Sequence, residues 1–245
     1  MLLFLAALSV LFAVAVGLRA LAKSPVYQLF GGIVPRVQTT DSIVALTFDD
    51  GPTVAVRDTL LATLALRGVH ATFFVVGSAL AGAPELGNAL HEAGHELGNH
   101  TYTHRRMVPV RQGTIAFEIE RTDSLIRAAG HDGAIHFRPP YGYKLLGLPW
   151  YLARRDRLTI TWDVEPDSYP DVAATAGGIV RHVMERVRPG SIILLHPWYA
   201  SRATSLGAVG PLIDSLHARG YRVGTVAALM RARDMRDTGV QVRLP

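Results

Sequence analysis

Short β-branched or apolar runs alternate with longer stretches at helical spacing along most of the chain. Runs of this kind, bounded by turn residues, indicate strands, and the stretches between them indicate helices. The expected strands are 43–48, 71–76, 95–99, 134–137, 158–162, 191–195 and 221–225. The expected helices are 56–66, 84–93, 114–129, 146–155, 173–186, 210–219 and 226–233. This alternation predicts an α/β fold with parallel strands.

The number of strand–helix units limits the architecture. Seven units occupy about 195 residues, fewer than the roughly 250 that an eight-stranded barrel usually needs. A smaller barrel and an open doubly wound sheet are therefore both compatible with the pattern. In either fold, ligand chemistry gathers at the carboxyl ends of the strands.

The first 18 residues form an apolar segment that is long enough to cross a bilayer. We expect an uncleaved anchor, because the run exceeds the roughly 7–15 residues of a signal-peptide core and no Lys or Arg precedes it. A signal peptide cleaved at Ala20-Leu21-Ala22 is the alternative, and a buried helix is a third. Arg19, Lys23 and Arg36 follow the segment, and the positive-inside rule alone would leave the domain in the cytoplasm.

The chain divides into four parts. We expect an anchor or signal peptide over 1–22, a connector over 23–40, one domain over 41–235 and a tail over 236–245. The connector has little periodicity and contains several prolines and glycines, which interrupt regular structure.

Composition excludes several classes of protein and of site. Hydrophobic residues make up 49% of the chain and charged residues 18%, which excludes a disordered chain. The chain has no cysteine, so any bound metal must be held by His, Asp or Glu. The net charge of +5 suits an anionic membrane or cell-wall surface. We expect no nucleic-acid partner, because the chain lacks a long basic stripe with interleaved aromatic residues.

Carboxylates and histidines follow the first and third expected strands. Asp49 and Asp50 end the first strand, where a cation would relieve the repulsion between adjacent carboxylates. A capped Asp-Gly-Pro turn is the alternative there. His100 and His104 follow the third strand, and two histidines at this spacing can bind one metal ion. Two solvent-exposed histidines are the alternative in that loop.

A competing zinc-peptidase pattern lies just before the third strand. His91-Glu92-Ala93-Gly94-His95 matches H-E-x-x-H, which needs one continuous helix to bring both histidines to the same face. Gly94 is a poor residue for a helix interior and a good one for a helix end. We therefore expect a helix to end here, and the peptidase hypothesis ranks last.

The remaining candidates follow the fourth, fifth and sixth strands. Arg138 precedes two prolines, which stiffen the loop and leave the amide of Tyr141 as its first free N–H group. An arginine beside such an amide suits an oxyanion site, although a rigid connector has the same sequence features. Three carboxylates follow the fifth strand, and His196 follows the sixth, where a core histidine is the alternative.

Taken in chain order, these segments resemble the first, second, third and fifth motifs of the NodB-type polysaccharide deacetylases, carbohydrate esterase family four. The matching segments are Thr47-Phe48-Asp49-Asp50-Gly51-Pro52, His100-Thr101-Tyr102-Thr103-His104, Arg138-Pro139-Pro140-Tyr141-Gly142 and Leu194-Leu195-His196. The resemblance covers about 41–235. It implies a distorted (β/α) barrel of about seven parallel strands, the NodB homology domain, which in this chain follows an N-terminal hydrophobic helix.

The resemblance also implies a metal-dependent hydrolase that removes N-acetyl groups from an amino-sugar polymer. Asp50, His100 and His104 match the family's metal ligands, usually of Zn²⁺, with Co²⁺, Ni²⁺ or Mn²⁺ as alternatives. Asp49 matches the general base that takes a proton from the attacking water. Arg138 matches the cation that orients this base and keeps it charged.

Further roles follow from the same resemblance. His196 matches the general acid that protonates the leaving amine, and Leu194 would line the pocket for the acetyl methyl group. The amide of Tyr141 would help to stabilise the oxyanion. Trp198 and Tyr199 lie close by and are candidates for stacking on a sugar ring, with core packing as the alternative.

The fourth motif of the family, commonly an Asp followed by a Trp, is altered here. An ungapped alignment places Ser168 and Tyr169 at those positions. We expect Asp167 to be the carboxylate partner of His196, because a catalytic imidazole needs such a partner to stay protonated. The alternatives are the nearby Asp163 and Glu165.

The leading hypothesis is a membrane-attached, zinc-dependent N-deacetylase that acts as a monomer. Its substrate would be an acetylated polymer such as peptidoglycan or a chitin-like oligosaccharide, which places the domain outside the cytoplasm, against the positive-inside rule. The protein would be secreted if the N-terminal segment is cleaved. O-acetyl esterase activity or a non-sugar amide substrate would fit the same family. A non-catalytic carbohydrate-binding relative is the alternative from another class.

Overall fold

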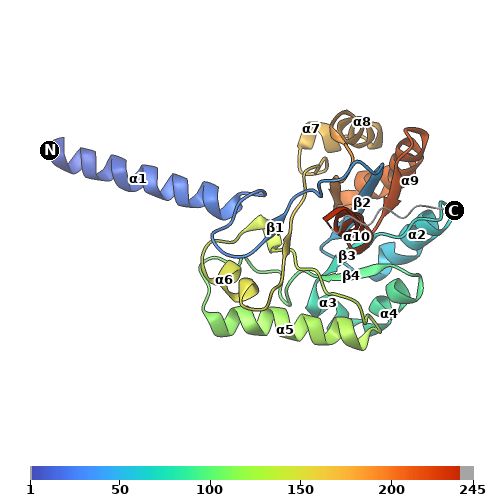
Figure 1. Cartoon of the computed structure of the whole chain (residues 1–245), viewed down its shortest axis with the longest axis horizontal. Coiled ribbons are helices and arrows are strands. Elements are labelled where there is room, and N and C mark those ends of the chain that lie inside the picture. The colour runs from blue at the N-terminus through green and yellow to red at the C-terminus, as the bar shows by residue number, and fades with distance from the viewer. Residues whose placement is uncertain (1, 238–245) are drawn as a thin grey trace.

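Parallel strands form the centre of the domain, and helices surround them (Figure 1). The computed structural model describes residues 2–237, with the side chains of 4–233. The larger sheet has the order β4-β3-β2-β6, with β7 also paired to β2, and a second pair joins β1 to β5. The strands are β1 (Ile33–Val34), β2 (Ile43–Asp49), β3 (Thr72–Val75), β4 (Glu96–Asn99), β5 (Thr159–Ile160), β6 (Ile192–Leu195) and β7 (Arg222–Gly224).

Single bridges continue the parallel pairing beyond these strands. Phe137 bridges both Asn99, at the end of β4, and Thr159, in β5. Val164, which follows β5, bridges Ile193 in β6. The pairing therefore runs from β2 through β4 to β5 and returns to β2 through β6, as expected of a distorted barrel. The predicted α/β fold with parallel strands is confirmed, although the expected strand over 134–137 is reduced to the bridge at Phe137.

The central strand explains the apolar runs in the sequence. Every residue of β2 is buried, and so is every residue of β3 and β6 beside it. Strands covered on both faces carry continuous apolar runs instead of alternating patterns. Asp49 ends the buried β2, so its carboxylate lies where solvent is nearly excluded.

Helices connect most of the strands. They are α2 (Val54–Ala65), α3 (Gly77–Gly82), α4 (Pro84–Glu92), α5 (Gln112–Ala128), α6 (Gly147–Ala153), α7 (Pro170–Ala173), α8 (Ala176–Arg186), α9 (Ala203–Ala218) and α10 (Val226–Asp237), with 3-10 turns η1 (Pro140–Gly142) and η2 (Ala200–Arg202). The expected helix over 173–186 corresponds to α8, which begins at Ala176 because Thr175 caps it by accepting a hydrogen bond from the Gly178 amide. Helix α9 begins earlier than expected and contains Pro211.

Helix α1 (Leu2–Lys23) extends away from the domain (Figure 1). Its stretch Phe4–Lys23 is long and apolar enough to cross a membrane, and none of its most apolar window is buried in the protein. A helix buried in the domain, the third reading of this segment, does not match that exposure. An anchor and a signal sequence remain equally compatible with it, since both pass the same test of length and apolarity.

The segment between α1 and the domain is more ordered than the expected connector over 23–40. It contributes β1 to the pairing with β5, and the amide of Val37 donates to the carbonyl of Gly190 over 2.9 Å. Of the expected tail over 236–245, residues 236–237 belong to α10, and 238–245 lie outside the described residues.

Candidate active site and metal centre

The carboxyl ends of β2, β4 and β6 meet at a cavity of about 490 Å³. Its lining includes the predicted residues Asp49, Asp50, His100, His104, Leu194 and His196. These residues are far apart in the chain and come together because parallel strands end at one edge of the sheet. Tyr141 also lines the cavity.

Asp50, His100 and His104 form a cluster of potential metal ligands. Each offers one ligand atom, and these atoms lie within 4.8 Å of one another. The Oδ1 atom of Asp50 is 2.9 Å from Nε2 of His104 and 3.4 Å from Nε2 of His100. Two imidazole nitrogens and one carboxylate oxygen, open on the side of the cavity, match the donor set of a catalytic zinc site. The residues present therefore fit a divalent metal ion.

The backbone fixes the orientation of His100. Its Nδ1 atom lies 2.8 Å from the carbonyl oxygen of Arg138, and since a carbonyl can only accept, Nδ1 carries the proton. Nε2 is then left as the ligand atom on the side of Asp50. This is the usual arrangement of a metal-binding histidine held by an outer partner.

Glu118 and Asn99 hold the loop that carries the two histidines. One carboxylate oxygen of Glu118 accepts hydrogen bonds from the amides of Tyr102 and Thr103, each at 2.8 Å. The other oxygen accepts from the Thr103 hydroxyl at 2.6 Å. The Asn99 side chain accepts from the amide of Thr101 at 2.8 Å. Neither residue was predicted from the sequence. Glu118 lies in α5, and only tertiary packing brings it to this loop.

Left-handed backbone conformations concentrate at this site. Among the described residues, five other than glycine have positive φ, and four of them are Asp50, Thr101, His104 and Tyr141. Such conformations cost about 1–3 kcal/mol each for residues with a Cβ atom. The surrounding contacts must offset this cost, which indicates that the loops are held in geometries that aim their side chains.

Asp49 is paired with a fully buried arginine. Nη1 of Arg138 is 2.7 Å from Oδ1 of Asp49 and also donates to the hydroxyl of Thr47. Nη2 donates to the carbonyl of Thr161, and the guanidinium lies over the ring of Phe74. Burial lowers the pKa of Arg138 from its usual value, and the charge of Asp49 opposes this shift. Arginine is so basic that the guanidinium of Arg138 nevertheless remains charged.

Asp50 is kept ionised by its neighbours. Burial alone would raise its pKa, but the adjacent imidazoles of His100 and His104 outweigh burial and hold the pKa well below the usual range. An aspartate in this state presents a full negative charge to a cation at neutral pH.

Asp167 is the carboxylate that contacts His196. Its Oδ1 atom lies 3.0 Å from Nδ1 of His196, and its Oδ2 atom accepts from the amide of His196 and from the hydroxyl of Ser205. Burial lowers the pKa of His196, but the hydrogen bond and charge of Asp167 outweigh this and raise the pKa to about 9. The imidazole is therefore protonated at neutral pH.

The two alternative carboxylates have other partners. Asp163 accepts from the amide of Ile192 and from the hydroxyl of Ser191, so it fastens the start of β6. Glu165 lines the cavity and accepts from the hydroxyl of Ser168 at 2.7 Å. Burial raises the pKa of Glu165.

The aromatic residues near the site differ in exposure. Trp198, which we expected in the substrate pocket, is buried and packs against Phe73, and the cavity lining does not include it. Its ring also lies against Gly51, where a Cβ atom would be only 2.0 Å from it. Tyr141 and Tyr169, by contrast, line the cavity and are about half exposed. The sequence analysis placed Tyr169 in the altered fourth motif and did not predict its position at the rim.

Comparison with known proteins agrees with this arrangement. A model of the polysaccharide deacetylase family matches residues 36–172. The chain belongs to this family. A chitooligosaccharide deacetylase of Sinorhizobium fredii is 33% identical over 77% of this chain and 92% of its own length. The peptidoglycan-N-acetylmuramic acid deacetylase PdaC of Bacillus subtilis is 31% identical over 83% of this chain. The match takes in only 43% of the length of PdaC.

A solved structure extends the family relationship to the fold. The peptidoglycan N-acetylglucosamine deacetylase Bc1960, solved in complex with a naphthalenyl N-hydroxybenzamide, superposes with a TM-score of 0.74 at 27% identity. The alignment covers 79% of this chain and 90% of that one. The resemblance stated from the motifs is therefore confirmed, and so is the parallel α/β fold, with which a distorted barrel is consistent.

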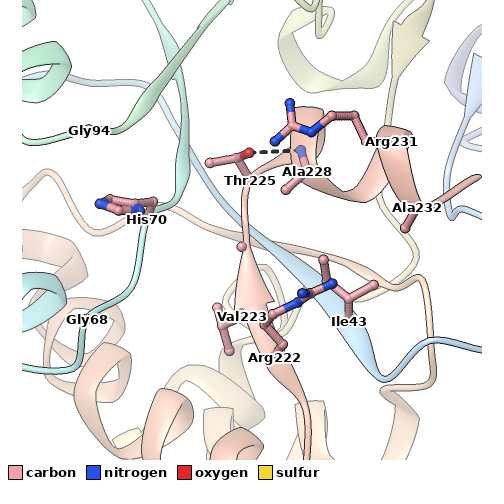
Figure 2. Close-up of a pocket in the computed structure, with 11 residues that line it drawn as sticks. Ile43, Gly68, His70, Gly94, Arg222, Val223, Thr225, Ala228, Arg231 and Ala232 are labelled. Atoms are coloured by element: carbon pink, nitrogen blue, oxygen red, sulfur yellow. Dashed lines mark hydrogen bonds between the residues drawn. The ribbon is translucent and has the colours of Figure 1, made fainter. Parts of the chain in front are cut away.

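The deacetylase domain has a second cavity, of about 600 Å³, at the opposite ends of the strands (Figure 2). It lies beside Ile43, at the start of β2, and is lined by His70, Arg222 and Arg231. Its described lining contains no carboxylate and a single histidine, so it lacks a set of metal ligands. The cluster of potential metal ligands formed by Asp50, His100 and His104 lines the first cavity.

The zinc-peptidase pattern is divided between two elements. Helix α4 ends at Glu92, and Gly94 turns the chain with φ of 79° before His95. The ring of His91 contacts His131, while that of His95 contacts Phe73 and is buried. Burial lowers the pKa of His95 to about 4. The two histidines thus do not share a helix face, as the position of Gly94 predicted.

Proposed function

We propose that this polysaccharide deacetylase is a metal-dependent N-deacetylase of an acetylated amino-sugar polymer. One observation carries the proposal. The Asp50, His100 and His104 cluster shares a cavity with a carboxylate held by an arginine and a protonated histidine held by an aspartate. Hydrolysis of an amide needs a base for the attacking water and an acid for the leaving nitrogen, and both types of group face this cavity.

A divalent ion would be held by Asp50, His100 and His104. When bound, such an ion polarises the acetyl carbonyl and makes water a better nucleophile. The mixed nitrogen and oxygen donor set favours Zn²⁺, and Co²⁺, Ni²⁺ or Mn²⁺ are alternatives. The absence of cysteine from the chain leaves no thiolate to compete for these ions.

The protein residues would divide the proton transfers between them. Asp49, oriented by Arg138, takes a proton from the water as its oxygen attacks the acetyl carbon. The amide of Tyr141 donates a hydrogen bond to the developing oxyanion. His196, kept protonated by Asp167, then delivers a proton to the nitrogen as the C–N bond breaks. Acetate and a free amine are the products.

The residues that line the cavity support a saccharide substrate. Leu194 is buried at its base and would receive the acetyl methyl group. Tyr141 and Tyr169 are half exposed at its rim, where aromatic faces can stack on sugar rings. The relatives named above act on chitooligosaccharide or on peptidoglycan, and we propose one of these polymers as the substrate.

We also propose that α1 anchors the protein in a membrane with the catalytic domain outside the cytoplasm. The exposure and apolarity of α1 support an anchor, and the polymers on which the relatives act support the location. Cleavage of the segment would instead release the domain.

The test is metal removal from the whole protein. After chelation we expect acetate release from N-acetylated chitooligosaccharides and from peptidoglycan to cease, and added Zn²⁺ or Co²⁺ to restore it. Full activity of the metal-free protein would refute the mechanism. Loss of bound metal is read separately by elemental analysis, and His100→Ala and His104→Ala should each lose the ion. The control His91→Ala lies in the peptidase pattern and should keep both metal and activity.

A protein that binds these glycans but releases no acetate in any metal state would instead be the non-catalytic carbohydrate-binding relative. The presence of both proton-transfer residues beside the ligand cluster argues against that outcome.

A further inference from the structure

The chain that leaves α1 forms one wall of the catalytic cavity. Lys23, the last residue of α1, and Pro25 line the cavity together with the metal-ligand cluster. The hydroxyl of Thr161, which also lines it, donates to the carbonyl of Pro25 over 2.6 Å. No linker therefore separates the apolar helix from the catalytic cavity, because the last residue of the helix already lines it.

The junction between α1 and the domain, residues 22–25, is held to the domain by hydrogen bonds and is not a free linker. Ala22 is buried, and its carbonyl accepts from the amide of Lys144 at 2.8 Å. The buried side chain of Lys144 donates to the carbonyl of Ser24. The ammonium of Lys23 lies 5.5 Å from the ring centre of Tyr143. A helix attached in this way holds the domain close to whatever surrounds the helix.

Large apolar side chains are exposed around this junction. We call them the collar, and they are Val26, Tyr27, Leu29, Phe30, Leu146 and Trp150. The first four follow α1, and the last two lie on or just before α6. Gly31 packs against Ala153 of α6, and Trp150 and Leu146 precede Ala153 by three and seven residues, on the same face of the helix. The end of the segment that follows α1 therefore lies against the helix that carries Trp150.

The collar has the composition of a membrane interface. Trp and Tyr are enriched where a protein meets the headgroup region, and basic residues there attract anionic lipids. The guanidinium of Arg154 lies 5.1 Å from the ring centre of Trp150, and Lys23 belongs to the adjoining junction. Figure 1 shows α1 leaving the domain on the side of β1 and α6, with α2 on the opposite side. A helix of 22 residues is about 33 Å long, which matches the hydrocarbon thickness and puts Lys23 at the bilayer surface.

We propose that the collar rests on a lipid bilayer and that the catalytic cavity opens at the membrane surface. The substrate would then be an acetylated saccharide held at that surface. This inference rests on the proposed anchoring by α1, and its second half rests on the proposed deacetylase activity.

The contact with lipid can be measured in the full chain. Because the chain contains no cysteine, one introduced cysteine can be labelled specifically with a fluorophore. V26C and L146C place a fluorophore in the collar. V54C and L66C are the controls, on α2 and just after it. Val26 and Val54 are 65% and 64% exposed, and Leu146 and Leu66 are 56% and 82% exposed. Each protein is reconstituted in vesicles of phosphatidylcholine and phosphatidylglycerol that contain lipids with a nitroxide below the headgroup.

We expect the nitroxide to quench the labels at 26 and 146 several times more strongly than those at 54 and 66. Equal quenching at all four positions, in protein that floats with the vesicles, would overturn the collar. Protein that does not float with vesicles would overturn the anchor and the collar with it. Neither result depends on catalytic activity.

A second measurement tests the position of the cavity. The same vesicles carry an N-acetylated chitooligosaccharide attached to a lipid, and its deacetylation is compared with that of the free oligosaccharide. We expect kcat/KM to be about tenfold or more higher for the attached form, because both reactants share one surface. V26D with L146D leaves α1 as the anchor but should lower this preference, because the cavity would no longer be held at the bilayer surface, and should leave activity on the free form unchanged. Equal rates for both forms would overturn the inference, whereas no turnover of either would refute the proposed function instead.

Discussion

Asp49 and His196 approach one cavity from the ends of two paired strands, β2 and β6. Arg138 holds the first residue, and Asp167 holds the second. Two residues of opposite charge, each fixed by its own partner, can remove one proton and deliver another without exchanging roles. Single substitutions should therefore separate the two steps.

His196→Ala should lower the rate of amide hydrolysis by about 10²–10⁴, the usual contribution of a general acid. The loss should be much smaller on an activated acetate ester, because its leaving group departs without a proton. Initial rates on an N-acetylated chitooligosaccharide and on 4-nitrophenyl acetate measure the difference. Asp49→Asn serves as the comparison and should lose activity on both substrates. Equal losses for His196→Ala on amide and ester would show that His196 is not the acid.

At the scale of elements, α5 positions the loop that carries His100 and His104, because the carboxylate of Glu118 accepts three hydrogen bonds from that loop. Glu118→Gln keeps the shape of the side chain but replaces one acceptor oxygen with an amide that can only donate. We expect metal affinity to fall about 10–100-fold, the range usual for the loss of a group that positions metal ligands.

Calorimetric titration of the metal-free variant with Zn²⁺ measures this affinity. Glu120→Gln is the matched control on the same helix. Glu120 accepts from Tyr151 and Arg155, away from the histidines, so its loss should leave the affinity unchanged. Similar affinities for both variants and the wild type would contradict a positioning role for Glu118.

At the scale of the whole molecule, a buried carboxylate joins four parts of the chain. Glu96 in β4 lies 2.5 Å from Nδ1 of His136 and accepts from Thr72 in β3 and from the amide of Ala227 in α10. Burial raises the pKa of Glu96, but the hydrogen bond from His136 and the others outweigh burial and lower it below the usual 4.5. The stabilisation is therefore present above pH 4.5 and is lost as the pH falls through the lower folded-state value.

Glu96→Gln should reduce the free energy of unfolding by about 3 kcal/mol at pH 7, because it leaves hydrogen-bond donors around a buried carboxylate unsatisfied. The difference from the wild type should narrow as the pH falls below 4.5. Urea unfolding in the presence of a chelator, at several pH values, measures it. The exposed Glu92 at the end of α4 provides the control Glu92→Gln, for which we expect a change within about 0.5 kcal/mol. A difference for Glu96→Gln that is constant with pH would contradict the account.

The sequence by itself determined the parallel α/β fold and the residues at the strand ends. Buried strands such as β2 and β6 can be predicted because a continuous apolar run is a local property of the sequence. The end of α4 at Gly94 is equally local, since glycine adopts positive φ without a steric cost. The strand expected over 134–137 was wrong, since only Phe137 pairs there, through single bridges that depend on its neighbours in space and not on a local pattern.

Only the tertiary structure decided which of three carboxylates contacts His196, because Asp163, Glu165 and Asp167 lie within five residues and differ only in what packs around them. It likewise placed Trp198 in the core and brought Glu118 to the histidine loop. The position of Lys23 beside the catalytic cavity was also decided only by the tertiary structure. Each of these contacts joins segments that are distant in the chain, and such pairings follow from how the elements pack and not from local pattern.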